Sequence, residues 1–182
     1  MEENCDDNID NNCDGQVNEG CLTCTDTIED GGFESGTPNS YWIEASTNFG
    51  TPICNVSNCG QVSGTGPYQG EYWVWFGGAD NEVGSVQQSV TIIPGANTLR
   101  FYMELPLCEA GSYDQFSIYI DGNQVYYTDG NDPRCNSVGY QARDVNIAAY
   151  ADGNVHSILF QGLNDISNPT NFFVDSIKLI CD

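Results

Sequence analysis

The side chains best suited to chemistry lie at the N-terminus, where oxygen-bearing residues recur at every second position. They are Asp6, Asn8, Asp10, Asn12 and Asp14, and Gly15 follows the last of them. Calcium takes six to eight oxygen ligands at short range, and a glycine permits the sharp turn that gathers such ligands around one ion. The spacing therefore predicts calcium binding, against the alternative of a solvated, disordered acidic tail.

Residues 10–15 match the calcium-loop pattern D-x-[DN]-x-[DN]-G in full. Gln16 would offer its backbone carbonyl, and Asn18 falls at the ninth position of the loop. The twelfth position is Cys21, where an EF-hand has a bidentate glutamate, and no helical periodicity flanks the loop. We therefore expect a calcium loop that is not an EF-hand, completed by Glu19 or by the oxygen-bearing residues before position 10.

Residues 5–15 and 18–21 resemble the short bacterial metal-binding repeat of the MopE type, C-D-x-x-D-N-D-C-D-G-x-x-D-E-G. More distantly, they resemble the thrombospondin type-3 repeat. The resemblance covers about a tenth of the chain and implies association with calcium. Asn12 and Asn18 stand where the bacterial repeat has aspartate, so we expect weaker binding than an all-carboxylate loop would give.

Composition excludes several classes of partner. The chain has 182 residues with four basic and 26 acidic side chains, a formal net charge of −22. Nucleic acid and anionic membranes attract Lys and Arg, so neither is an expected partner. No stretch approaches the roughly 20 apolar residues of a membrane helix. Met1 is followed by acidic residues, and we interpret the chain as a piece of a larger secreted protein.

Residues 25–182 contain short β-branched and aromatic runs separated by turn signals, with no helical periodicity. The expected strands are residues 41–45, 72–76, 86–93, 98–104, 115–120, 124–128, 142–148, 155–161 and 172–180. Asp121-Gly122 is a strong hairpin signal between two of them. The pattern predicts an all-β fold: an antiparallel, jelly-roll-like sandwich after an acidic, cysteine-rich calcium segment at residues 1–24.

Nine cysteines indicate an oxidising compartment, but the sequence does not fix how they pair. Pairs that could form are Cys54–Cys59, Cys108–Cys135 and Cys24–Cys181, the last because the first and last strands of a sandwich usually adjoin. Cys5, Cys13 and Cys21 then remain for the acidic loop, where they cannot all pair. A thiolate zinc site is disfavoured because no second C-x-x-C accompanies residues 21–24.

Residues 31–181 resemble jelly-roll carbohydrate-binding modules and the adhesin-type or MAM-like sandwiches of bacterial secreted proteins. The resemblance rests on residues 32–36 with Trp42 at the start, residues 75–90, 145–147 and 156–160 in the middle, and residues 173–179 at the end. In those families an opening glutamate and a closing aspartate often hold a structural calcium, which implies that role for Glu34 and Asp175. The alternative is that Glu34 caps a turn and Asp175 lies at the surface.

Aromatic side chains are the candidates for stacking on sugars, although most aromatics of a sandwich are core. Trp73 and Trp75 share a strand face and form the best pair, with burial as the alternative. Tyr126 and Tyr127 cannot both face inward, so one should be exposed. We find no catalytic motif, since His156 is the only histidine and its run predicts a strand.

We therefore expect a secreted, calcium-binding, non-catalytic sandwich that binds a polysaccharide or surface glycan, or mediates adhesion. The alternative is a structural subunit of an extracellular assembly that self-associates through calcium, since chains of this charge repel one another unless cations screen them. A third possibility is a spacer domain without a ligand.

Overall fold

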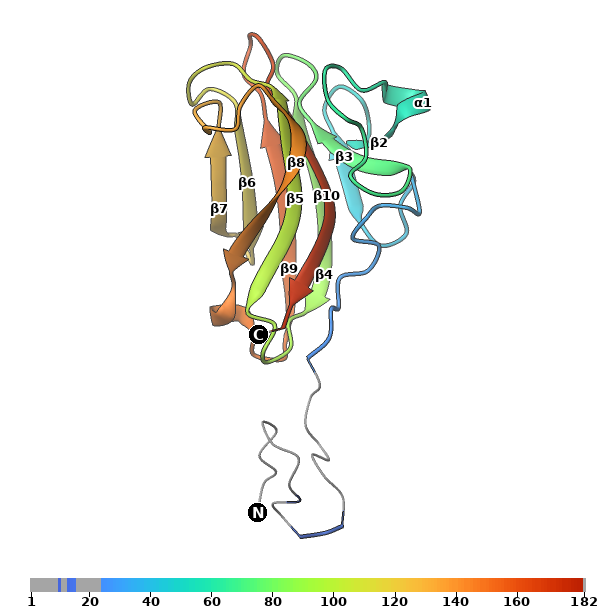
Figure 1. Cartoon of the computed structure of the whole chain (residues 1–182), viewed down its shortest axis with the longest axis vertical. Helices are drawn as coiled ribbons and strands as arrows, with labels where there is room; N and C mark the ends of the chain where they lie inside the picture. Colours follow the sequence, from blue (N-terminus) through green and yellow to red (C-terminus); the bar gives the residue numbers. More distant parts are fainter. Residues whose placement is uncertain (1–9, 11–12, 16–23, 182) are drawn as a thin grey trace.

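The computed structural model describes residues 10, 13–15 and 24–181, and it forms a sandwich of two antiparallel five-stranded sheets (Figure 1). Sheet 1 contains, in spatial order, β1 (Ile43–Ser46), β4 (Val83–Thr91), β9 (Val155–Leu163), β6 (Gln115–Ile120) and β7 (Asn123–Asp129). Sheet 2 contains β2 (Ile53–Asn55), β3 (Tyr72–Phe76), β10 (Asn171–Ile180), β5 (Thr98–Leu107) and β8 (Ser137–Asn146). The predicted jelly-roll-like sandwich is confirmed.

The core between the sheets follows from the alternation of apolar residues along the strands. Phe101 of β5, Phe116 of β6 and Phe160 of β9 are fully buried and contact one another edge-on or tilted. At Gly162 a Cβ atom would lie 2.4 Å from Cβ of Phe76 in the facing sheet. Only glycine therefore permits this close approach of β9 to β3.

Sheet 2 is covered on its outer side by residues 60–71, which two buried carboxylates hold in place. Glu104 accepts hydrogen bonds from the backbone N–H and hydroxyl of Thr65 and from the N–H of Gly139. Asp175 accepts hydrogen bonds from the N–H groups of Tyr68 and Gln69. This cover creates a second small core, in which Trp73 and Phe173 pack against Cys54.

The last strand, β10, is buried on both faces because the outer side of sheet 2 is also covered. The sequence indicated that one face of residues 172–180 should be core, but every residue from 171 to 175 is buried. Sheet 2 is covered here by the main core on its inner side and by residues 60–71 on its outer side, so both faces of the strand are buried. A register irregularity between Asp175 and Lys178, with Ser176 at φ 51°, then shifts the strand relative to β5.

Among the described residues, three disulfides join positions whose pairing the sequence left open: Cys24–Cys181, Cys54–Cys59 and Cys108–Cys135. The first joins the segment before the sandwich to the end of β10. The second encloses the short helix α1 (Val56–Cys59), and a single 3₁₀ turn spans Ala148–Tyr150. No helix among the described residues is long and apolar enough to cross a membrane.

Candidate functional site

The sandwich brings Glu34 and Asp175 to the same loop, residues 68–72. Glu34 accepts hydrogen bonds from the N–H groups of Glu71 and Tyr72, beside the Asp175 contacts to Tyr68 and Gln69. Gly32 lies between the two carboxylates, since a Cβ there would sit 3.8 Å from each side chain. Every carboxylate oxygen of the pair has an N–H donor, since the N–H of Ser176 donates to Asp175 Oδ1. Glu34 Oε2 accepts only one of these hydrogen bonds and so keeps a lone pair that a cation could use.

Asp175 is 0% exposed. Burial is the main cause that raises the pKa of its carboxyl from the ordinary 3.8 to about 6. The negative charge of Glu34 contributes to this rise, and three backbone N–H donors act against it. A calcium ion would favour the ionised form and oppose this rise. The pair therefore has the chemistry of a cation site, and calcium there stays a prediction.

In the N-terminal segment, the described residues form one tight turn around a carboxylate. Asp10 accepts hydrogen bonds from the N–H groups of Cys13, Asp14 and Gly15, at 2.6, 3.2 and 2.8 Å. The φ angles of Cys13 and Gly15 are positive, at 65° and 94°. Gly15 adopts such an angle without strain because it has no Cβ. The other predicted ligands, Asp6, Asn8, Asn12, Gln16, Asn18 and Glu19, lie outside the described residues.

The four predicted aromatic residues are separated by the fold. Trp73 is 0% exposed and packs against Cys54 and Phe173, so neither face of its indole is open to a ligand. Tyr126 packs against Phe101 in the main core, and Tyr127 is 44% exposed on sheet 1. One tyrosine of the pair is thus exposed, as the alternation required. Trp75 is half-buried and borders a cavity.

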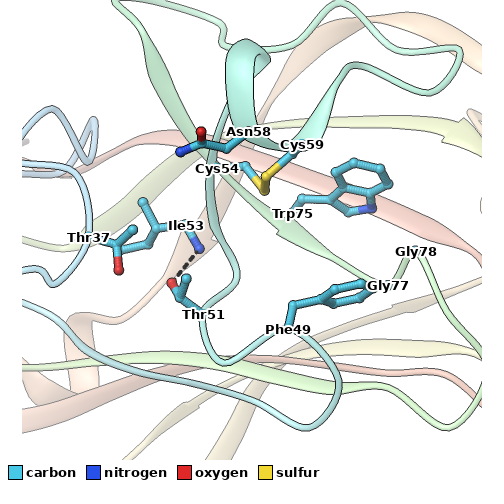
Figure 2. A pocket seen from close by; sticks show the side chains of 10 residues that line it. All are labelled: Thr37, Phe49, Thr51, Ile53, Cys54, Asn58, Cys59, Trp75, Gly77 and Gly78. Atoms are coloured by element: carbon cyan, nitrogen blue, oxygen red, sulfur yellow. Dashed lines mark hydrogen bonds between the residues drawn. A yellow bond between two sulfur atoms is a disulfide. The ribbon is translucent and has the colours of Figure 1, made fainter.

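That cavity has a volume of about 410 Å³. Figure 2 shows Trp75 of β3 and Phe49 of the loop after β1 on one side of it, with Thr37 and Ile53 on the other side and the Cys54–Cys59 disulfide beside Trp75. Phe49 is 59% exposed. Sequence analysis missed Phe49 because a lone aromatic in a Thr-Asn-Phe-Gly-Thr loop carries no periodic signal.

Local contacts fix the cavity wall. The indole N–H of Trp75 donates a hydrogen bond of 2.9 Å to Asn171 Oδ1. At Gly78, which has φ 80°, a Cβ atom would lie 3.2 Å from the Trp75 ring, so the glycine lets the chain pass close to the indole. Asn55 caps α1 by accepting a hydrogen bond from the N–H of Asn58. These contacts keep the cavity open without a ligand.

The cavity is uncharged, although the chain carries a net charge of −22. The residues that line it are Thr37, Phe49, Thr51, Ile53, Cys54, Asn58, Cys59, Trp75, Gly77 and Gly78. The nearby carboxylate of Glu44 accepts hydrogen bonds from the hydroxyls of Thr37 and Thr51. The arrangement suits a neutral ligand with one apolar face and several hydroxyl groups.

The outer face of sheet 1 is a second uncharged surface. At positions that alternate with the core, its described residues are uncharged except Asp129 at the end of β7. A shallow hollow on this face is lined by residues that include Tyr119, Gln87 and Gln161. Ile43, on the edge strand β1 of the sheet, is 72% exposed. This face can accept a neutral partner.

His156 occupies a structural position. Its Nδ1 lies 2.7 Å from Asp121 Oδ2 and its Nε2 lies 3.0 Å from Asp152 Oδ1. The hydrogen bonds to Asp121 and Asp152 raise the pKa of the imidazole above its ordinary value. The side chain thus joins the β6–β7 turn to the segment before β9.

One further group could hold a metal ion. Glu109, Asp114 and Asp165 each offer a carboxylate oxygen, and these oxygens lie within 4.8 Å of one another. No sequence pattern marks this group, because the three residues come from two loops that are distant along the chain.

Comparisons with known proteins identify the class of fold. No protein-family profile and no curated protein matches this sequence. Among solved structures, the carbohydrate-binding module TmCBM61, in complex with β-1,4-galactotriose, matches with a TM-score of 0.58 and 15% identity over 87% of this chain and 100% of that chain. The K2 cleaved adhesin domain of Lys-gingipain matches with a TM-score of 0.52 and 15% identity, over 86% of this chain and 99% of that chain.

The K1 cleaved adhesin domain of Lys-gingipain from Porphyromonas gingivalis W83 also matches, with a TM-score of 0.52 and 10% identity over 83% of this chain and 96% of that chain. The chain is therefore a β-sandwich with the fold found in carbohydrate-binding modules and adhesin domains. At these identities the likeness establishes the fold alone.

Proposed function

We propose that this chain is a non-catalytic carbohydrate-binding module of a secreted or cell-surface protein, and that the cavity lined by Phe49 and Trp75 receives the sugar. The observation that carries the proposal is the chemistry of the cavity wall: two aromatic rings and neutral hydrogen-bonding groups in a strongly acidic chain. Three disulfides support an extracellular location.

A pyranose ring has one face rich in C–H groups and a rim of hydroxyls, and the cavity offers a partner for each. The C–H face would pack on the ring of Phe49 or Trp75. The rim would exchange hydrogen bonds with Asn58 and with backbone groups at Gly77 and Gly78. The short disulfide loop and the capped helix hold these groups in place before the sugar arrives, which lowers the entropic cost of binding.

The experiment is binding of soluble neutral polysaccharides, by affinity electrophoresis across a panel and calorimetry on any that retard the chain. Phe49→Ala should weaken binding about 30-fold, since truncation of an aromatic anchor at a binding site costs about 2 kcal/mol. Phe49 is exposed, so its removal should leave the melting temperature unchanged.

Tyr127→Ala, on the outer face of sheet 1, is the matched control. Full binding by Phe49→Ala with loss of binding by Tyr127→Ala would move the site to sheet 1. No retardation by any glycan would contradict the proposed function.

We also propose that calcium is the natural cofactor, bound at the N-terminal segment and at the Glu34–Asp175 pair. The support is the ligand spacing around Asp10 and the burial of Asp175 beside a second carboxylate. Binding to the native chain alone raises stability by mass action. A melting temperature that is the same in calcium and in chelator would contradict this.

The second candidate function, a self-associating structural subunit, is favoured by the outer face of sheet 1. Two chains of charge −22 would meet with least repulsion at a face that is almost uncharged. Light scattering in calcium tests this: Ile43→Glu, which adds charge at a 72% exposed position, should abolish any growth in particle mass. A monomer with and without calcium would exclude this function.

A further inference from the structure

Two loops at one end of the sandwich place three carboxylates together. Glu109 and Asp114 lie between β5 and β6, and Asp165 lies between β9 and β10. Their oxygens approach within 4.8 Å of one another. No ion pair joins any of the three to a basic side chain in the part of the chain that the structure describes. Like charges therefore converge here without a protein cation to offset them.

Backbone donors satisfy part of this group. Asp114, which is 1% exposed, accepts hydrogen bonds from the N–H of Asp165 at 2.8 Å and from the N–H of Thr170 at 2.6 Å. Asp165 Oδ1 accepts one from the N–H of Ser167 at 2.8 Å. The bonds orient the carboxylates of the two loops toward one another.

Two buried oxygens at this end have no hydrogen-bond partner, and they are the observation that points to a ligand. One is Glu109 Oε2, and the other is Oδ1 of Asn164, a residue that is 3% exposed. Asn164 precedes Asp165, and its amide donates to the carbonyl of Thr170, the residue whose N–H binds Asp114. A buried oxygen without a partner costs free energy, more so for a charged group, and a cation removes that cost.

We propose that Glu109, Asp114 and Asp165 bind a divalent cation, with Asn164 Oδ1 as an additional oxygen donor. An all-oxygen ligand set of this charge suits a hard cation, and calcium tolerates the irregular geometry of ligands from two loops. The site differs from the Glu34–Asp175 pair, where every carboxylate oxygen already has an N–H donor. It stands independently of the proposed sugar site.

The cation would clamp the β5–β6 loop to the β9–β10 loop. The second loop in turn holds the β3–β4 loop, since Asp165 O accepts a hydrogen bond of 2.5 Å from the N–H of Asn81 and Asn164 Nδ2 donates to Ala79 O. Gly77 and Gly78 at the start of that loop line the cavity described above. Ordering by the cation therefore extends toward the cavity wall.

The test is thermal unfolding of the full chain in chelator and in a calcium titration, with Glu109→Gln and Asp165→Asn compared with the wild type. At a hundredfold excess over the dissociation constant, one site raises the melting temperature by about 5–10 °C. Each variant should lose that part of the rise. In chelator Glu109→Gln should melt at or above the wild type, because it removes one of three converging charges.

Asp80→Asn is the matched control, since it makes the same charge change on an exposed residue at this end of the sandwich. It should keep the full rise. A calcium-dependent rise in both cluster variants equal to that of the wild type, or no rise in the wild type, would overturn the proposal.

Hydrogen exchange on the unmodified chain provides a second measurement if a variant fails to fold. The amides of Asp165 and Thr170, which donate to Asp114, should exchange at least tenfold more slowly in calcium than in chelator. Unchanged exchange at both amides would also overturn the proposal.

Discussion

Replacement of Asp175 by asparagine should remove a pH-dependent part of the free energy of unfolding. Asp175 is fully buried, and its carboxyl has a pKa raised to about 6, chiefly by burial. The carboxylate anchors residues 68 and 69 to sheet 2 through their N–H groups. The ionised carboxylate of Asp175 therefore accepts hydrogen bonds that hold the loop, but its burial costs desolvation free energy.

The sign and size follow from proton linkage. Below pH 3.8 the carboxyl is protonated in the folded and the unfolded chain. Between pH 3.8 and about 6 the folded chain holds a proton that the unfolded chain has released, so the free energy of unfolding falls as pH rises. Each pKa unit corresponds to about 1.4 kcal/mol, which gives a total loss of about 3 kcal/mol from this group in the absence of a cation.

The assay is urea unfolding in chelator from pH 3.5 to 7, followed by tryptophan fluorescence and extrapolated linearly to water. The stability difference between the wild type and Asp175→Asn should change by about 3 kcal/mol across this range, whereas Asp80→Asn, an exposed carboxylate, should show little change. Parallel pH profiles for the wild type and Asp175→Asn would refute the reasoning.

Calcium provides a second arm of the same experiment. An ion held by Glu34 and Asp175 needs ionised carboxylates, so saturating calcium should abolish the loss between pH 3.8 and 6. A loss that persists in calcium would exclude Asp175 as a ligand.

Two further predictions concern the ends of the sandwich. Hydrogen bonds to Asp121 and Asp152 raise the pKa of His156 in the folded chain. The contribution of the protonated imidazole to stability is therefore complete below pH 6.5 and is lost as the pH rises through the raised pKa. The stability difference between the wild type and His156→Gln should shrink over that range. Removing the Cys24–Cys181 disulfide, which spans 157 residues, should lower the free energy of unfolding by about 5 kcal/mol through loop entropy. Removing Cys54–Cys59, which spans 5 residues, should lower it by about 2 kcal/mol. Equal losses in denaturant unfolding would contradict the entropic explanation.

Local patterns in the sequence were enough for most of the strands. The alternation in residues 98–104 and 115–120 predicted β5 and β6, and the Asp121-Gly122 signal falls at the turn into β7. The three-residue strand β2 was missed because Ile53–Asn55 is too short to show a period. Adjacency of the first and last strands suggested the Cys24–Cys181 pair, but only the structure distinguished the three disulfide pairs from other pairings.

Side-chain exposure depended on contacts that the sequence does not display. Trp73 and Trp75 share a strand face by alternation, yet Trp73 is buried with Cys54 and Phe173 while Trp75 borders a cavity. Phe49 lines the same cavity from the loop after β1. Which aromatic is open to a ligand was therefore decided by the tertiary contacts around each ring.

The sequence by itself determined the strand period, the class of sandwich, the acidic charge and the calcium-type spacing at the N-terminus, because each is a property of neighbouring residues. Tertiary structure alone decided the uncharged cavity and the grouping of Glu109 and Asp114 with Asp165, which lies 51 residues beyond Asp114. Residues so far apart meet only when the whole core packs, since that packing supplies the free energy that holds both loops in place.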